Sequence, residues 1–390
     1  MKIDDSIIIK TVAEYSFQND EKTAFFYDSK ILSHRLTLLK NNYPKDTIHA
    51  IAIKTCDYKP VLETIIKKGF ALEAASIEEV EKAVNAGAAA SNIVFDSPVK
   101  TKEEIELCHT KYKGIRMNAN SIEELERYPS SFNGLVGLRI NPLVTNDADP
   151  LFNISLLDSK FGVPISKLDD ILSACMKHSQ IKCLHFHVSS GLKNYKAKLE
   201  AAKKIVELAR TINAQRSARN ISSKIECIDI GGGIEYNSEN NYSQLKEFCD
   251  KLSEIEGIED FQLVTEYGKF IHKDAAYVVS RIEYIVENSP QLPKIAFIHI
   301  GADLFVRKVY SILKINYPWL IIRNKQTSNS KKYNYKIVGP LCFAGDILYE
   351  KITTEEFSAG DLFVMKEVGA NTISMWSKHC SRKKPRIILL

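Results

Sequence analysis

From about residue 48, short apolar runs alternate with stretches in which apolar residues recur at the spacing of one helix face. Eight of these runs are expected to be strands: IHAIAIK, FALEAA, IVFD, IRMNA, LVGLRIN, IKCLHFHV, IECIDIGG and FQLVTEYG. Behind two of them, Ser76 with Glu79 and Ser121 with Glu124 have the spacing of a helix-capping box. Eight strand–helix units predict an α/β fold, a TIM-type (β/α)8 barrel with a closed parallel sheet.

Beyond residue 270 the helical period fades. The runs AYVVSRIEYIVE, KIAFIHI, YNYKIVG and DLFVMKEV alternate instead, and they are separated by polar turns such as NKQTSNSKK. The first 25 residues, which include SIIIKTVAEY, precede the barrel and are expected to add strands to the same region. Residues 26–270 are therefore predicted to form the barrel, and residues 1–25 with 271–390 a β-rich domain of barrel or sandwich type.

Composition narrows the functional class. The 390 residues are 45% hydrophobic and 26% charged, which suits two globular domains. The 53 basic and 48 acidic residues are interspersed, so the chain is not expected to bind nucleic acid. The eight cysteines form no CxxC pair, and no apolar stretch approaches the roughly 18 residues of a membrane span. We expect a cytoplasmic protein that does not contact membranes.

Polar and glycine residues gather where the predicted strands end, which is where barrels of this type place their sites. They are Lys54, Glu73, Arg139, Asn141, His185, His187, Gly231, Gly232, Gly233, Glu266 and Gly268. Each has two interpretations. A lysine at a strand end is desolvated and suited to a Schiff base, or it extends into solvent. A glycine run cradles a phosphate, or it forms a tight turn.

The acid and the histidines are equally ambiguous when each is taken alone. Glu266 could pair with a cationic ring nitrogen or with a structural Arg or Lys, and His187 could be an ordinary core histidine. His185 and His187 together suggest a metal, but no third ligand has suitable spacing, so no metal is predicted. Together, an anchoring lysine, an anion site, a flat histidine and a carboxylate match what pyridoxal phosphate (PLP) requires.

These residues resemble a known family, the fold-type III PLP decarboxylases that act on ornithine, diaminopimelate and arginine and share the alanine racemase fold. The resemblance covers nearly the whole chain, in the family's order. Its motifs are AIKTC, LEAASIEEVEKAVNAG, GLRINP, SKFGVP, LHFHVSSG, IDIGGG, TEYGK, VGPLCFAGD and VGANTISM. The branch most similar in spacing is that of diaminopimelate decarboxylase and the siderophore-pathway enzymes.

The resemblance implies a role for each matching residue. Lys54 would carry PLP, His187 would stack on its ring, and Glu266 would pair with its nitrogen. Further cofactor-binding residues would be Glu73, Arg139, Ser190, Gly231, Gly232, Gly233, Gly268, Lys269 and Asn371. Arg307, Tyr310 and Phe343 would meet the substrate.

The resemblance also implies a homodimer with shared active sites. Cys342 would come from the partner subunit and protonate the α-carbon after carbon dioxide leaves. Lys160 and Asp346 would form a salt bridge across the dimer interface.

Four positions depart from the family pattern. Lys269 stands where the family has an arginine, Asn371 replaces a tyrosine, and Ser189 replaces a glycine after the histidine. Phe343 follows the catalytic cysteine, where family members carry an acidic residue that binds the distal amine of the substrate. A phenyl ring cannot form a charge pair with an ammonium group as a carboxylate does.

We therefore hypothesise α-decarboxylation of a diamino acid with a modified distal end, such as a citryl-diamino acid in carboxylate siderophore synthesis. The alternatives are a diaminopimelate decarboxylase, an ornithine or lysine decarboxylase, a racemase, and a catalytically impaired member that acts as a binding protein. A racemase would need a tyrosine base, and VGPLC favours the decarboxylase instead.

Overall fold

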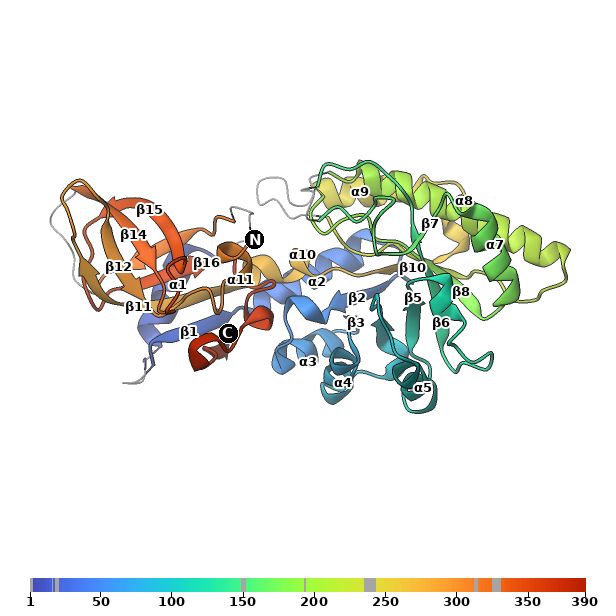
Figure 1. Cartoon of the computed structure of the whole chain (residues 1–390), viewed down its shortest axis with the longest axis horizontal. Coiled ribbons are helices and arrows are strands. Elements are labelled where there is room, and N and C mark those ends of the chain that lie inside the picture. Colours follow the sequence, from blue (N-terminus) through green and yellow to red (C-terminus); the bar gives the residue numbers. More distant parts are fainter. Residues whose placement is uncertain are drawn as a thin grey trace. The chain divides into compact units, whose positions relative to one another are not determined.

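The computed structural model describes residues 3–15, 17, 21–148, 152–192, 194–234, 243–311, 315–324 and 331–390. The chain divides into two compact units (Figure 1). One unit runs from His34 to Ile271, and the other joins Met1–Ser33 to His272–Leu390. Each unit is described separately below.

The first unit is built on a closed ring of eight parallel strands. They are β2 (Ile48–Ala52), β3 (Ala71–Ala74), β4 (Ile93–Phe95), β5 (Arg116–Ala119), β6 (Leu135–Asn141), β8 (Ile181–His185), β9 (Cys227–Asp229) and β10 (Gln262–Thr265). Each strand pairs with the next in this order, and β10 pairs with β2 to close the ring. The predicted barrel is confirmed. A short extra strand, β7 (Val163–Pro164), pairs with β6.

Helices lie outside the ring of strands (Figure 1). They are α2 (Ser29–Asn42), α3 (Lys59–Lys67), α4 (Ile77–Asn85), α5 (Lys102–Thr110), α6 (Ile122–Leu125), α7 (Leu168–Lys177), α8 (Lys196–Ala218), α9 (Ser243–Ser253) and α10 (Lys269–His272). Ser76 and Ser121 cap α4 and α6 as predicted, but the Glu79 and Glu124 carboxylates accept from the residue before each cap. The complete capping box is at Thr101, before α5.

The side chains inside the barrel form layers, because side chains alternate between the two faces of each strand. Side chains two positions apart on a strand point to the same face, so each strand contributes successive residues to successive layers. The lower layer is apolar, made of Ala50, Ala71, Val94, Cys183, Cys227 and Val264. Two residues further along β3, β4, β8, β9 and β10, the same face presents Glu73, Asp96, His185, Asp229 and Glu266. The polar layer therefore lies above the apolar one, at the C-terminal ends of the strands.

The second unit is a sheet with the strand order β13 (Trp319–Ile322), β16 (Leu362–Lys366), β11 (Ala276–Val286), β12 (Lys294–Ile298), β14 (Lys332–Val338) and β15 (Ile347–Glu355). Off this path, β1 (Thr23–Tyr27) pairs with β11 and with β17 (Arg386–Leu389). All four strands predicted beyond residue 270 are present. Most of the predicted NKQTSNSKK turn lies outside the described residues.

The segment SIIIKTVAEY was expected to supply a strand, and this expectation is wrong. It forms helix α1 (Asp5–Glu14), because Asp4 caps the first turn by accepting a hydrogen bond from the Ser6 amide. Ile8 and Val12, four residues apart, then pack into the core of this unit. A three-residue apolar run fits a helix or a strand equally well, and the cap with the i, i+4 spacing decides between them. The N-terminal region still contributes one strand, β1.

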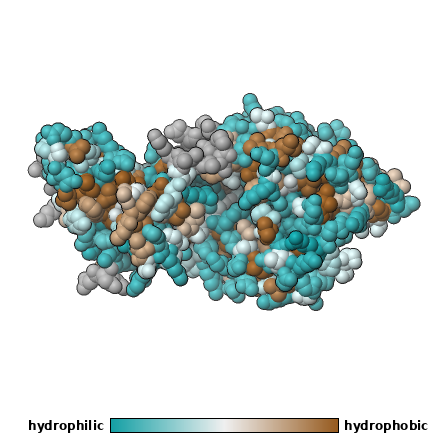
Figure 2. Space-filling view, viewed as in Figure 1, coloured by the Kyte–Doolittle hydropathy of each residue, from teal (hydrophilic) through white to brown (hydrophobic). Residues whose placement is uncertain are grey.

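The face drawn in Figure 2 is largely hydrophilic, with hydrophobic residues in smaller groups between charged ones. Within the described ranges, none of the helices combines the length and the apolar character needed to span a bilayer.

Candidate active site

The polar layer at the barrel mouth centres on Lys54 and Glu73. Lys54 follows β2 in a single 3-10 turn (Ile53–Thr55), and its Nζ donates to both carboxylate oxygens of Glu73 at 2.6 Å. Glu73 is fully buried, and this burial raises its pKa to about 8 although Lys54 opposes the shift. Burial alone would lower the pKa of Lys54, but the Glu73 and Glu266 carboxylates outweigh it and raise the pKa. About half of the Lys54 side chain is exposed in this chain, so the amine can be reached from outside.

A second chain of charges crosses the barrel beneath the mouth. His185 Nδ1 lies 3.5 Å from Asp96, and His185 Nε2 lies 3.4 Å from Glu266. Although burial opposes it, the two carboxylates raise the His185 pKa to about 9. Arg139 holds the other oxygen of Asp96 at 3.1 Å. His185 and Arg139 overcome the effect of burial and lower the pKa of Asp96.

His187 is held by the glycine loop that follows β9. Its Nδ1 accepts a hydrogen bond from the Gly232 amide at 3.1 Å, which assigns the proton to Nε2 in the neutral ring. Burial, followed by the positive charge of Arg139, lowers the His187 pKa well below its usual range. A neutral ring of fixed orientation is suited to stack on a flat ligand.

The loop Gly231–Gly233 has no space for side chains. At Gly232 a Cβ would lie 2.3 Å from the Glu266 carbonyl oxygen. At Gly233, where φ is +97°, it would lie 1.9 Å from the Ser189 oxygen. Gly268 is packed as closely, since a Cβ there would meet Thr55 at 2.4 Å. The glycines therefore place no side chains over the backbone after β9, and an anion could approach it closely, as in other backbone anion sites.

For the other predicted residues of the barrel unit, the contacts described below involve neither Lys54 nor the acids and histidines of the polar layer. Asn141 ends β6 and is buried, and its side chain donates to the Leu156 carbonyl. Ser190 and Lys160 are exposed, and Lys269 begins α10 in a half-buried position. The Lys160 ammonium lies 5.1 Å from the centre of the Phe161 ring.

The remaining predicted residues belong to the β-rich unit. Cys342 is an exposed free thiol, and next to it Phe343 stacks on Tyr310 with ring centroids 5.3 Å apart. Arg307 lies in the short helix α11 (Val306–Val309) and is half buried, and this burial lowers its pKa. Asn371 adopts a left-handed backbone, with φ at 54°, which asparagine tolerates better than most residues.

Asp346 has partners within its own chain. It is buried, and its two oxygens accept hydrogen bonds from the backbone amides of Ala302 at 2.6 Å and Leu341 at 2.8 Å. Within its own chain Asp346 therefore stabilises the backbone. The expected salt bridge between Asp346 and Lys160 of the partner subunit stays a prediction.

The residues present fit PLP. Among the described residues, no group donates a hydrogen bond to the buried Glu266 Oε1, so this oxygen could accept one from the ring nitrogen of PLP. Because the glycine loop has no side chains, a phosphate could approach it closely, and Lys54 offers an amine. Each of these features belongs to the barrel unit.

Sequence reasoning missed three residues of this cluster, namely Asp96, Asp229 and Lys198. Asp96 ends the run IVFD, and its place at a strand end was the available signal. Asp229 is two residues beyond Cys227 in the same strand, and Asn118 donates to it across the barrel at 3.5 Å. Lys198 interrupts the apolar stripe of α8 and is completely buried.

A metal interpretation is also geometrically open. Asp96, His185 and Glu266 each offer one ligand atom, and these atoms lie within 4.8 Å of one another. The sequence argument that no third ligand accompanies the histidines overlooked acids from β4 and β10, which are distant in sequence. The raised pKa of His185 favours a protonated ring between the two acids, and a protonated ring has no lone pair to offer a metal.

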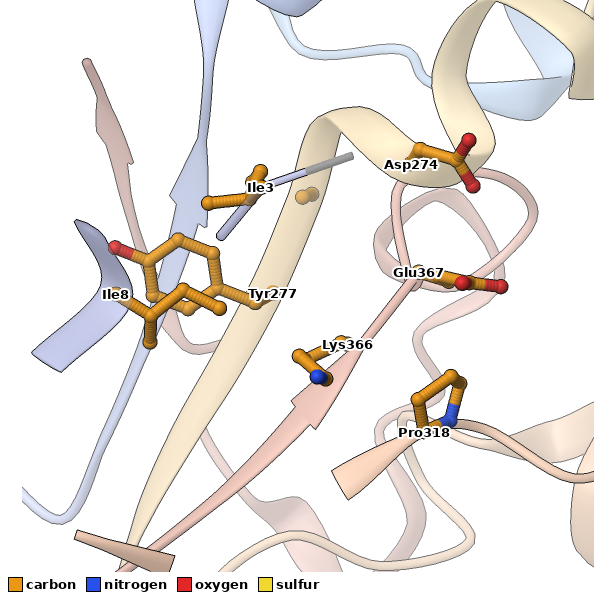
Figure 3. A pocket seen from close by; sticks show the side chains of 8 residues that line it. Ile3, Ile8, Asp274, Tyr277, Pro318, Lys366 and Glu367 are labelled. Carbon is orange, nitrogen blue, oxygen red and sulfur yellow. The ribbon is translucent and has the colours of Figure 1, made fainter. Parts of the chain in front are cut away.

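A cavity of about 80 Å³ lies in the β-rich unit and involves none of these residues (Figure 3). Ile8 and Tyr277 line one side, and Asp274 and Glu367 the other. Lys366, which also lines it, is paired with Asp5 at 2.6 Å.

Residues 30–273 match the family model of the pyridoxal-dependent decarboxylases, pyridoxal binding domain. Diaminopimelate decarboxylase of Bacteroides thetaiotaomicron is 25% identical over 386 residues, covering 95% of this chain and 96% of the relative. The crystal structure of diaminopimelate decarboxylase from Helicobacter pylori with L-lysine superposes with a TM-score of 0.81 at 23% identity, over 96% of this chain and 93% of that one. A lysine/ornithine decarboxylase from Vibrio vulnificus with cadaverine gives a TM-score of 0.79 at 21% identity, over 100% and 99% of the two chains.

Proposed function

This chain belongs to the pyridoxal-dependent decarboxylase family, and we propose that its substrate is a diamino acid whose distal amine is covered. As a member of this family it uses PLP and decarboxylates an amino acid. A citryl-diamino acid of carboxylate siderophore synthesis is the example we favour. The observation that carries the proposal is the aromatic pair of Phe343 and Tyr310 beside Cys342.

No carboxylate in this segment is placed to pair with a distal ammonium. Phe343 occupies the position of the family's acidic residue and is 40% exposed, as is expected of a residue that contacts a ligand. The next acid along the chain, Asp346, is buried and uses its two oxygens on backbone amides. A flat, uncharged group such as an amide can stack on these rings without the counter-ion that a desolvated ammonium would need.

The residues of the barrel would bind and orient the reactants. When bound, PLP supplies an aldehyde for a covalent bond to an amine, and a ring that accepts the electron pair left by the departing carboxylate. Lys54 would provide the resident amine, and Glu73 would hold its proton while the site is open. Glu266 would face the ring nitrogen with His185 behind it, and neutral His187 would lie against the ring.

We further propose that the enzyme acts as a homodimer with shared active sites. Cys342 is exposed in the single chain and has no thiol partner among the described residues, so it is available to a neighbouring subunit. From the partner's site it would deliver a proton to the substrate α-carbon once carbon dioxide has left. Lys160, exposed on the barrel unit, would contribute to the same interface.

The second candidate is diaminopimelate decarboxylation. The observation that favours it is the match to enzymes of that name along almost the whole chain. Ornithine or lysine decarboxylation is a third possibility, supported by similarity of fold.

The deciding experiment measures carbon dioxide release by the PLP-loaded protein. The panel holds ornithine, lysine and diaminopimelate, each with and without a citryl group on the distal amine, together with free arginine. We expect release from conjugates alone, and none from the Lys54→Ala variant. Release from free diaminopimelate, with none from conjugates, would overturn the substrate proposal and leave the family assignment intact.

A further inference from the structure

Lys198 contacts the carbonyl side of the glycine loop. It is in the first turn of α8 and shares a face with Ala201, Ala202 and Ile205, all of them buried. Only 1% of Lys198 is exposed. A lysine in an apolar helical stripe is costly to bury, so its contacts must compensate.

Those contacts are the carbonyl oxygens of the loop. Lys198 Nζ donates to Gly231 O at 3.1 Å and to Gly232 O at 2.5 Å. The Phe248 and Tyr267 rings lie on either side, with centroids 5.8 and 5.5 Å from Nζ. The Gly231 amide donates to Asp229 Oδ1, and the Gly232 amide donates to His187 Nδ1. Lys198 thereby fixes the orientation of two consecutive peptide groups.

The charge of Lys198 is not neutralised by an ion pair. Among the residues that the structure describes, no carboxylate forms a salt bridge with Nζ, although Asp229, Glu266 and Cys249 lie close enough to interact electrostatically. A buried cation with no paired anion is strongly disfavoured, and here burial lowers the pKa of Lys198 to about 7. An anion near the loop would compensate this charge, and the glycines of the loop carry no side chain that would keep an anion away.

We propose that Lys198 is a positioning residue for the cofactor phosphate, holding the Gly231–Gly232 peptides in place and contributing a positive charge from behind the loop. This inference rests on the proposed placement of the phosphate at the loop and is independent of the substrate. The phosphate would be the counter-ion that the buried ammonium lacks. Lys198 itself would not touch the cofactor.

The test compares two ligands that cannot bond covalently to Lys54, pyridoxine 5′-phosphate and pyridoxine, binding to cofactor-free protein by calorimetry. Their ratio of affinities isolates the phosphate contribution. Lys198→Gln is one atom shorter but keeps two amide hydrogens for the carbonyls and removes the charge, so its ratio should fall about tenfold or more. Lys198→Arg should restore the ratio. The matched control is Lys203→Gln, an exposed lysine on the same helix.

Two outcomes would overturn the proposal. One is an unchanged ratio in Lys198→Gln, which means that the charge does nothing for the phosphate. The other is an equal loss of both ligands, which means that Lys198 only supports the fold.

If Lys198→Gln fails to fold, the proposal can be tested instead by measuring the affinity ratio of the two ligands for the wild type at several pH values. Above about pH 7 the ammonium is progressively lost, and the affinity ratio should fall by up to about tenfold per pH unit. The ratio of Lys198→Arg should stay flat. The other titratable groups that interact with Nζ or lie near it are Asp229, Glu266, Cys249, His187 and Tyr267. A fall that persists in Lys198→Arg assigns the effect to one of them and contradicts the proposal.

Discussion

His185 Nε2 lies 3.4 Å from Glu266 Oε2 in the interior of the barrel. The imidazole is also 3.5 Å from Asp96, so it connects an acid of β4 to an acid of β10. No part of this histidine is exposed. Its charge state is therefore set by the two acids rather than by solvent.

The first prediction concerns the pH dependence of folding. The folded pKa of His185, about 9, exceeds the ordinary value of 6.5, so its stabilising effect is complete below about pH 6.5. The effect is lost as the pH rises through about 9. The wild type should have a larger free energy of unfolding than His185→Gln at low pH. This difference should fall by on the order of 3 kcal/mol between about pH 6.5 and pH 9. Urea unfolding at several pH values measures it.

The matched control for this experiment is His379→Gln, which alters an exposed histidine of the other unit. Its difference from wild type should not vary with pH. A pH-independent difference for His185→Gln would show that the histidine is neutral in the fold.

The second prediction concerns Glu73 and the capture of PLP. Because Glu73 raises the pKa of Lys54, removing its charge should expose a reactive, unprotonated amine at lower pH. In Glu73→Gln the pH giving half-maximal rate of covalent PLP binding should therefore shift downward. Rapid mixing with absorbance detection of the bound cofactor measures the rate, and Glu81→Gln, on the exposed side of α4, is the control. An upward shift would mean that Glu73 acts as the proton acceptor instead.

The third prediction concerns Phe343. Phe343→Glu places a carboxylate beside Cys342, so it should admit free diamino acids and reject conjugates. We expect the ratio of kcat/KM values for free over citryl substrate to rise by about a hundredfold, the size of a charge-paired contact. Phe343→Leu removes the ring without adding charge, and it should weaken the conjugate without admitting the free amine. Equal behaviour of the two variants would argue against a role for charge at this position.

The fourth prediction separates steric exclusion from backbone strain at the glycine loop. Gly233 and Gly87 have nearly the same positive φ, +97° and +98°, but only at Gly233 would a Cβ meet a neighbour, at 1.9 Å. Gly87→Ala should cost about 1 kcal/mol of unfolding free energy from strain alone. Gly233→Ala should cost several times more, or abolish PLP binding. Similar losses in chemical denaturation would mean that the loop moves to accommodate the methyl group.

The barrel could be predicted because each of its strands is recognisable from a few consecutive residues. Each strand is a short, largely apolar run, and the chain repeats the pattern eight times. The layer of acids and histidines follows from the same period, since Glu73, Asp96 and Glu266 each stand two residues beyond a buried apolar position. Asp96 was overlooked although its run ends on it.

Other features depend on the third dimension. Helix α1 was mistaken for a strand because its apolar run is only three residues long, and only its packing against Phe26 and Tyr277 fixes its face. Lys198 is separated from the glycine loop by more than thirty residues, and no spacing rule joins them. The proximity of His185 to acids on two other strands is likewise invisible in a linear pattern.

The pairing of β1 with β17 affects how the polypeptide is made. The barrel strands lie within His34–Ile271 and can close while the ribosome is still translating the later segment. Strand β1, by contrast, emerges before them and must wait for Arg386–Leu389, with which it aligns in parallel. Strand β11 can cover one edge of β1 earlier, but until β17 is made the other edge is open to other chains. A nascent protein halted shortly before Arg386 would therefore be a candidate client for chaperones.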